Sequence, residues 1–173
     1  MGGFLLLIPF ILIRFGLLSL LNKEAIKRAA HFPVLIGNEV LAYWIYQISN
    51  IAIFVYMFFL KIEIKQSLMF YTSLIVYVFG IILLTLSVIN FANPSKDSIN
   101  INGVYRLSRN PMYVSYFIYF IGCVLLTQSI ILFGFVLLFQ ITTHWIILSE
   151  ERWCVNKFGE KYLQYMKNVR RYI

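Results

Sequence analysis

The sequence predicts an all-α protein: an integral-membrane bundle of about five transmembrane helices, followed by cytoplasmic amphipathic helices at the C-terminus. The first observation is composition. The chain of 173 residues is 61% hydrophobic and only 13% charged, and its mean hydropathy is +0.79. Soluble domains average about a quarter charged residues. A soluble chain of this length could not bury so much apolar surface, so a membrane protein forming a single domain over residues 1–173 is expected.

The second observation is the spacing of five apolar segments. A hydrocarbon layer of roughly 30 Å needs about 20 helical residues at about 1.5 Å each. The segments that meet or approach this length are residues 3–21, 40–60, 68–90, 112–127 and 130–149. The fourth segment is short and follows Pro111, so it begins either as an ordinary helix or as a broken or re-entrant element. A broken or re-entrant element is tolerated in a membrane only where its backbone faces protein or a polar cavity.

The tail, residues 150–173, is predicted to form two short helices. Gly159 interrupts them, as a glycine often does at the end of a helix. Beyond it, apolar and aromatic residues recur at helical spacing, with basic residues on the other side. This amphipathic helix is expected either to lie on the membrane as an interfacial anchor or to fold back over the bundle.

The third observation is the distribution of charge, which predicts the orientation. With five spans, three basic regions share one side: Lys23, Lys27 and Arg28; Lys96, Arg106 and Arg109; and Arg152, Lys157, Lys161, Lys167, Arg170 and Arg171. By the positive-inside rule, the N-terminus faces out and the tail faces the cytoplasm. The basic residues that give the net charge of +8 are therefore expected to set the membrane topology and to face anionic lipid. No nucleic acid is expected as a partner. A bacterial inner membrane is the expected location.

Several classes of site lack their sequence pattern. There is no glycine-rich phosphate loop and no Gly-x-Ser-x-Gly nucleophile motif. No His, Cys, Asp and Glu cluster has metal-like spacing, so no metal is expected. Cys123 and Cys154 are expected to stay reduced. His144 lies two helical turns before Glu151 and shares its face, so it is either a site residue or a hydrogen-bonded histidine of the bundle.

Two polar clusters are expected to meet at the cytoplasmic surface. One contains Arg109, and the other is the pair Glu150 and Glu151, which ends the last apolar segment. Adjacent helical residues point ~100° apart, so only one of the two carboxylates faces the bundle axis while its neighbour faces headgroups or the tail. An inward carboxylate in a membrane needs a cation. Either Arg109 supplies it internally, or the carboxylate binds an ammonium or ribose hydroxyls of a ligand while Arg109 binds a ligand carboxylate.

The residues around Arg109 favour a ligand site. Pro111 can begin a helix and leave nearby N–H groups free for an anionic group, and Asn110 before it is biased away from helix. Aromatic rings at the same depth could stack on a nucleobase or attract a sulfonium, or could form an interfacial belt. These rings belong to Tyr105, Tyr113, Trp145, Trp153, Tyr162 and Tyr165.

The order of these motifs resembles the isoprenylcysteine carboxyl methyltransferase and phospholipid methyltransferase superfamily. The resemblance rests on Gly103-x-Tyr105-x-x-Ser108-Arg109-Asn110-Pro111-Met112-Tyr113, then Gly122, then Glu150-Glu151 and Phe158-Gly159-x-x-Tyr162-x-x-Tyr165. It covers roughly the last seventy residues, and the first hundred match only as generic spans.

The resemblance implies an integral-membrane methyltransferase that uses S-adenosylmethionine and releases S-adenosylhomocysteine. It places the cofactor in residues 103–173, with Arg109, Asn110, Pro111 and Tyr113 lining the pocket. Glu150 or Glu151 would hold the methionine amine or the ribose, and Tyr162 and Tyr165 would close over it. Arg109, Glu150 and Glu151 are the predicted catalytic residues, and either glutamate could accept a proton if the methyl acceptor is an amine.

Two departures from the family pattern concern the acceptor. Asn110 stands where the family has His, and it cannot act as a base at neutral pH; Ser115 stands where many members have Gly. An isoprenylcysteine carboxylate or another lipid-like, amphipathic acceptor is expected. The alternatives are N-methylation of a phospholipid amine and a non-catalytic membrane protein that binds lipid.

Overall fold

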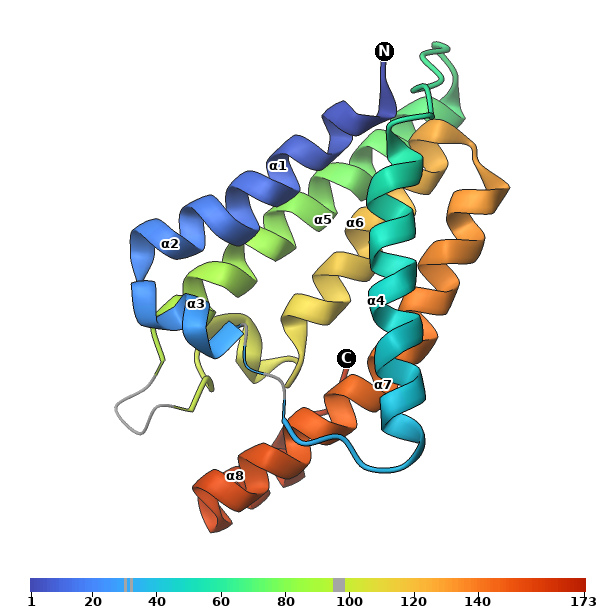
Figure 1. The fold of residues 1–173 in the computed structure, drawn as a ribbon. Coiled ribbons are helices and arrows are strands. Elements are labelled where there is room, and N and C mark those ends of the chain that lie inside the picture. Colours follow the sequence, from blue (N-terminus) through green and yellow to red (C-terminus); the bar gives the residue numbers. More distant parts are fainter. Residues whose placement is uncertain (30, 32, 95–98) are drawn as a thin grey trace.

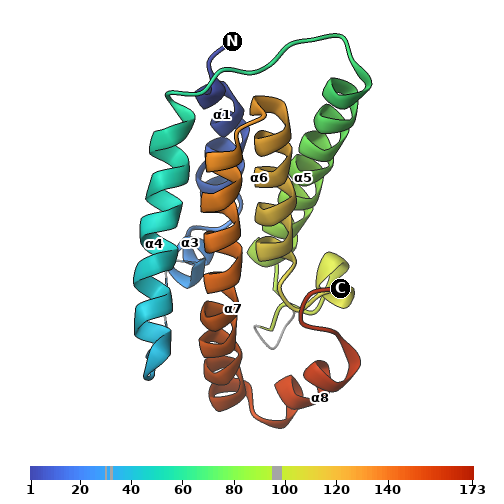
Figure 2. The same ribbon diagram turned by 90° about the vertical axis from the view of Figure 1, so that its right-hand side faces the viewer.

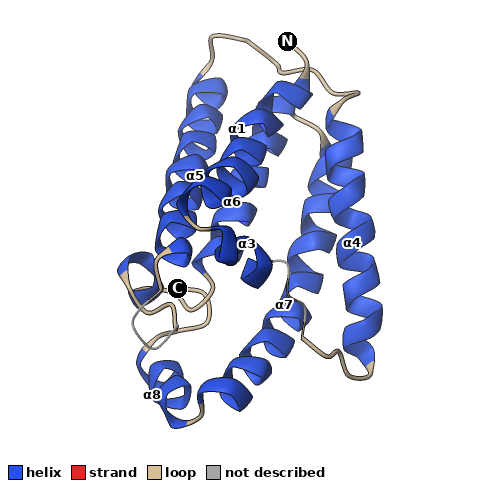
Figure 3. Cartoon of the chain, turned by 60° about the vertical axis from the view of Figure 1, so that its left-hand side comes forward, coloured by secondary structure: helices blue, strands red, loops and turns tan. Residues whose placement is uncertain are grey.

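The computed structural model describes residues 1–29, 31, 33–94 and 99–173, and in this part of the chain it is helical with no strand (Figures 1 and 3). Lys96, which the charge count included, lies outside the described residues. The helices are α1 (Leu7–Ile11), α2 (Leu18–Leu21), α3 (Lys23–Ala29), α4 (Asn38–Met57), α5 (Leu68–Ala92), α6 (Pro111–Thr127), α7 (Ile130–Phe158) and α8 (Glu160–Asn168).

The prediction of an all-α membrane bundle is confirmed. Four helical stretches are long and apolar enough to cross a membrane: Gly3–Leu21, Asn38–Met57, Leu68–Ala92 and Ile130–Phe158. The fifth predicted span corresponds to α6, a shorter apolar helix that starts at Pro111 and runs without a break to Thr127. The segment therefore begins as an ordinary helix with proline in its first turn, and not as a broken or re-entrant element.

The first span, Gly3–Leu21, contains a π-helical segment, Leu12–Leu17, between α1 and α2. The sequence predicted only a generic span here. Arg14 lies in this segment. Such π-helical turns are rare and are found frequently at functional sites.

The predicted boundary between the last span and the tail was wrong. We expected the span to end at residue 149 and two short helices to follow, but α7 continues to Phe158 and only α8 follows it. No glycine or proline occurs between Glu150 and Phe158, so nothing breaks the helix. Gly159 ends it with φ of +58°, a conformation that glycine adopts without strain.

Helices α5 and α6 form one closely packed pair, and α4 and α7 form a second (Figure 2). The first span lies along α5, as Figure 1 shows. Successive spans alternate in direction, so α3, the connection from α5 to α6, and α8 lie together at one end of the bundle (Figure 1). We call this the site end. Both predicted polar clusters lie there.

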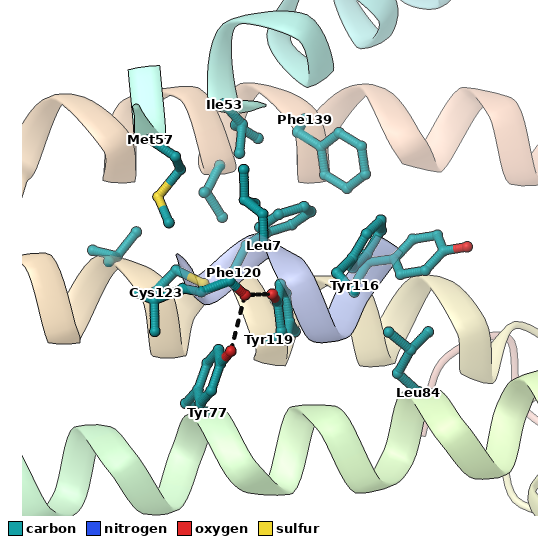
Figure 4. Close-up of a cluster of buried hydrophobic side chains, with 14 of the residues drawn as sticks. Leu7, Ile53, Met57, Tyr77, Leu84, Tyr116, Tyr119, Phe120, Cys123 and Phe139 are labelled. Atoms are coloured by element: carbon teal, nitrogen blue, oxygen red, sulfur yellow. Dashed lines mark hydrogen bonds between the residues drawn. The ribbon is translucent and has the colours of Figure 1, made fainter. Parts of the chain in front are cut away.

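A buried aromatic cluster packs the centre of the bundle (Figure 4). The ring of Phe10 in α1 lies 5.3–5.4 Å from the rings of Tyr116, Tyr119 and Phe120 in α6. The carbonyl of Leu6 accepts hydrogen bonds from the hydroxyls of both Tyr77 and Tyr119 (Figure 4). The first span is therefore attached to α5 and α6 by polar contacts inside an apolar core, where such bonds have no competing water.

Two glycines allow α5 and α6 to approach closely. A Cβ added at Gly80 would lie 2.6 Å from the Cα of Tyr119, and one added at Gly122 would lie 2.5 Å from the Cα of Tyr77. Each glycine therefore faces the backbone of the opposite helix. In a membrane, where lipid is as apolar as leucine, small residues of this kind supply much of the packing between helices.

We expect Gly80→Ala to lower the free energy of unfolding by about 1–3 kcal/mol, because the new methyl group would meet backbone atoms that cannot rotate away. The measurement is the melting temperature of the purified protein in detergent micelles. Gly134→Ala in α7 is the matched control, since a Cβ there meets nothing within 4 Å. A Gly80→Ala protein as stable as Gly134→Ala would contradict this account of the α5–α6 contact.

Candidate functional site

A cavity of about 930 Å³ extends from the site end into the bundle. Its walls come from the first span, α3, α4, the connection from α5 to α6, and helices α6, α7 and α8. Seven residues predicted for the site line it: Tyr105, Arg109, Asn110, Tyr113, Glu150, Tyr162 and Tyr165. The lining does not include the other three predicted residues, Pro111, His144 and Glu151.

Glu151 is buried beside the cavity, with 4% of its side chain exposed, and it binds two arginines. Its Oε1 lies 3.0 Å from Nη2 of Arg109, and its Oε2 accepts from Nη2 and Nε of Arg171 at 2.8 and 3.0 Å. Arg109 also donates to the carbonyl of Met166 at 3.0 Å. The sequence left open whether the inward carboxylate pairs with Arg109 or binds a ligand. For Glu151, the geometry shows the ion pair with Arg109.

The C-terminal segment, residues 169–173, is fastened to the segment before α6. The carbonyl of Arg170 accepts from the backbone N–H of Arg109 at 2.9 Å. The carbonyl of Arg171 accepts from Nδ2 of Asn110 at 3.1 Å and from Oγ of Ser108 at 3.3 Å. The hydrogen bond with Glu151 raises the pKa of Arg171, so this guanidinium stays charged. Together these contacts hold α8 across the site end.

Glu150 points to a different place, as the ~100° step between adjacent helical residues requires. Its carboxylate lines the cavity and accepts a hydrogen bond from the hydroxyl of Tyr113 at 2.6 Å. In the part of the chain that the structure describes, no Lys or Arg forms an ion pair with Glu150. The cavity therefore contains a carboxylate that is available to a positively charged ligand group.

Aromatic side chains of α8 form the cover of the cavity. The hydroxyl of Tyr165 donates to the carbonyl of Tyr105 at 2.6 Å, and the rings of Tyr162 and Tyr165 lie 5.7 Å apart. Burial raises the pKa of both tyrosines, so their hydroxyls are neutral donors at physiological pH. Trp153 in α7 lines the same cavity, with Nζ of Lys157 4.5 Å from the centre of its ring.

His144 and Pro111 lie outside the cavity lining. Nδ1 of His144 lies 2.7 Å from the hydroxyl of Tyr172, so the histidine contacts the C-terminal segment. Pro111 is buried at the start of α6. Both lie next to the segments that enclose the cavity, and the sequence-based prediction that they bind cofactor stays a prediction.

Sequence reasoning did not single out several residues of this region, and four of them bear on the arguments below. Arg14, Arg28 and Tyr116 line the cavity, and Arg171 binds Glu151. A charged side chain inside an apolar span was the available signal for Arg14. Arg28 and Arg171 carried no such signal, because membrane topology already explained the basic loop and the basic tail to which they belong.

Comparison with known proteins gives one match. A family model described as phospholipid methyltransferase matches residues 51–161, which is more than half of the chain. The matched region begins within α4 and ends within α8, so it contains the Arg109 segment and both glutamates. No curated protein and no solved structure matches the chain.

We expect Glu151→Gln to destabilise the protein by about 3 kcal/mol or more, because it leaves two guanidinium groups at a buried position without their carboxylate. The C-terminal segment should then detach and become accessible to trypsin. Melting temperature and limited proteolysis measure the two effects. Glu160→Gln, an exposed carboxylate on α8, is the control. Unchanged melting and proteolysis in Glu151→Gln would show that the ion pairs do not hold the segment.

Proposed function

The chain belongs to the phospholipid methyltransferase family, and from this premise we propose that it transfers a methyl group from S-adenosylmethionine to a lipid-like or amphipathic acceptor. The observation that carries the proposal is the carboxylate of Glu150, which is unpaired with any described cation, within a cavity bordered by membrane-spanning helices. The family supplies the class of reaction, and the cavity supplies a place where a charged donor and an apolar acceptor can meet.

The residues present fit such a donor. The cavity volume of about 930 Å³ lies within the range of about 300–1,000 Å³ that is usual for small-molecule sites. Glu150 would hold the ammonium or the ribose hydroxyls, and Tyr105, Tyr162 and Tyr165 provide ring faces for a nucleobase or a sulfonium. Nε of Arg109 is buried and has no hydrogen-bond partner, so it can still donate to a ligand.

When bound, S-adenosylmethionine supplies a methyl group on a positively charged sulfur atom. The contribution of the protein is alignment and the exclusion of water, which do not require a catalytic histidine or cysteine. An acceptor amine must lose a proton before it can be methylated. Glu150 can take that proton, whereas Glu151 is held by two arginines.

Two findings favour an amine of a phospholipid over an isoprenylcysteine carboxylate as the acceptor. The matching family model is the phospholipid branch of the superfamily. In addition, the carboxylate of Glu150 would repel a second carboxylate and would attract an ammonium. We therefore adopt N-methylation as the leading form of the proposal.

An opening toward lipid supports an acceptor that arrives from the membrane. Phe15 of the first span and Ile51 and Val55 of α4 line the cavity, yet 59%, 64% and 52% of these side chains are exposed at the surface. All three belong to membrane-spanning segments. We call this opening the lateral portal. A soluble donor would reach the site end from the cytoplasm, the side that the basic residues assign to it.

We expect purified protein to be stabilised by S-adenosylhomocysteine and Glu150→Gln to bind it about tenfold or more weakly, through loss of a charge-assisted hydrogen bond. The measurement is the melting temperature against ligand concentration. Glu63→Gln, in the α4–α5 connection at the opposite end of the bundle, is the control. No shift of the wild-type protein at millimolar ligand would contradict the proposal.

Methyl transfer itself is tested by incubating the protein with a radiolabelled methyl donor and membrane lipids, and then identifying the labelled product. A labelled aminophospholipid is the expected result. Binding of S-adenosylhomocysteine without any labelled lipid would instead favour the non-catalytic alternative.

We expect Ile51→Trp to raise KM for the lipid acceptor several-fold while leaving the affinity for S-adenosylhomocysteine unchanged, because the larger ring narrows the lateral portal and not the site end. Ile48→Trp is the matched control. Ile48 is also 64% exposed on α4, but it does not line the cavity. Equal KM values for the two variants would argue against entry of the acceptor between the first span and α4.

A further inference from the structure

The part of the cavity lining that comes from the first span and α3 includes two arginines. Arg14 belongs to the first span, and Arg28 belongs to α3. Both precede residue 51, where the family match begins. The proposed methyl transfer assigns neither of them a role.

Arg14 is a cation within a membrane-spanning segment. It lines the cavity from the π-helical segment Leu12–Leu17, where its guanidinium interacts with the hydroxyl of Tyr116 and makes a long hydrogen bond of 3.4 Å to the carbonyl of Ala29. Among the residues that the structure describes, it forms no ion pair. A charge in this position is costly and is usually kept because it binds something.

Arg28 has unused donor capacity in the same part of the lining. Its Nη2 donates to the carbonyl of Phe91 at 3.0 Å, while its Nε is buried without a hydrogen-bond partner. The neighbouring Lys27 differs, since its Nζ is paired with Glu24 at 2.9 Å and its side chain is 76% exposed. Lys27 also lines the cavity, but its charge is paired with Glu24 at the exposed surface, whereas neither arginine forms an ion pair among the described residues.

Glu150 does not neutralise the charge of Arg14 through a direct ion pair. The two side chains interact electrostatically but form no ion pair, and Glu150 accepts its hydrogen bond from Tyr113. The cavity is therefore lined by charges of both signs, and Arg14 and Arg28 are cations that its N-terminal part contributes. The guanidinium carbon of Arg14 lies 5.9 Å from the centre of the ring of Phe15, a residue of the lateral portal, so an anion held by Arg14 would lie next to the apolar opening.

We infer that Arg14 and Arg28 bind a negatively charged group, a phosphate or a carboxylate, on the amphiphilic methyl acceptor, and so determine which headgroup is admitted. The inference rests on the proposed function. An acceptor of this kind would present its anionic group to the arginines and its chain to the lateral portal. Arginine suits this task because its planar group donates to two anion oxygens at once.

The test uses the full chain in maltoside micelles with saturating S-adenosylhomocysteine. Dodecyl phosphate is titrated as the probe, with dodecyltrimethylammonium and inorganic phosphate in parallel, and the melting temperature is recorded. We expect dodecyl phosphate to stabilise the protein and Arg14→Gln to weaken its apparent affinity about tenfold or more. Arg28→Gln should weaken it as well, and Arg14→Lys should retain part of it. Arg106→Gln, an exposed arginine outside the cavity at the same end, should not change it.

Several results would overturn the inference. Unchanged affinity for dodecyl phosphate in Arg14→Gln would remove the role of Arg14. Equal binding of dodecyltrimethylammonium would mean that the chain alone is recognised, and equal binding of inorganic phosphate would mean a site for a free anion. Loss of S-adenosylhomocysteine binding in a folded Arg14→Gln protein would assign the arginine to the donor. Failure of the wild-type protein to bind S-adenosylhomocysteine would instead refute the proposed function.

Discussion

One buried carboxylate connects the parts of this protein that form the site. Glu151 binds Arg109 from the segment before α6 and Arg171 from the C-terminal segment, so a single charge on α7 joins three distant stretches of sequence. Because the carboxylate is 4% exposed, losing both arginines would leave a buried charge unpaired, and losing the carboxylate would leave both guanidinium groups without their counter-ion. The position of α8, and with it the cover over the cavity, follows from this arrangement.

The two adjacent glutamates consequently differ in what they can do, although they are chemically identical. The partners of Glu151 neutralise it and make it structural, whereas Glu150 faces the cavity with a tyrosine hydroxyl as its hydrogen-bond partner. Asn110 belongs to the structural group as well. Its amide donates to the carbonyl of Arg171, and this contact needs a donor but no base. The replacement of the family histidine at this position is therefore compatible with an intact site end.

Much of the fold was predictable from the sequence, because hydropathy and helix length constrain spans directly. The meeting of Arg109 with the glutamate pair followed from counting five spans and their charges. Which glutamate would be paired could not be predicted, because that depends on the rotation of α7 and on where the tail returns. The role of Arg171 was hidden for the same reason: a tail rich in basic residues looks alike whether its arginines face lipid headgroups or a buried carboxylate. The length of α7 was misjudged because Glu150 and Glu151 read as the end of a span, when their partners allow the helix to continue.

The residues that line the cavity come from two different parts of the chain. The wall with Glu150, Arg109 and the tyrosines of α8 comes from the part that resembles the methyltransferase superfamily, and most of it lies inside the family match. The wall with Arg14 and Arg28 comes from the part before the match. In this chain the part before the match contributes Arg14 and Arg28 beside an apolar portal, and the matched part contributes Glu150. An acceptor that crosses the cavity would then be oriented by charge before any contact with the transferred group is made.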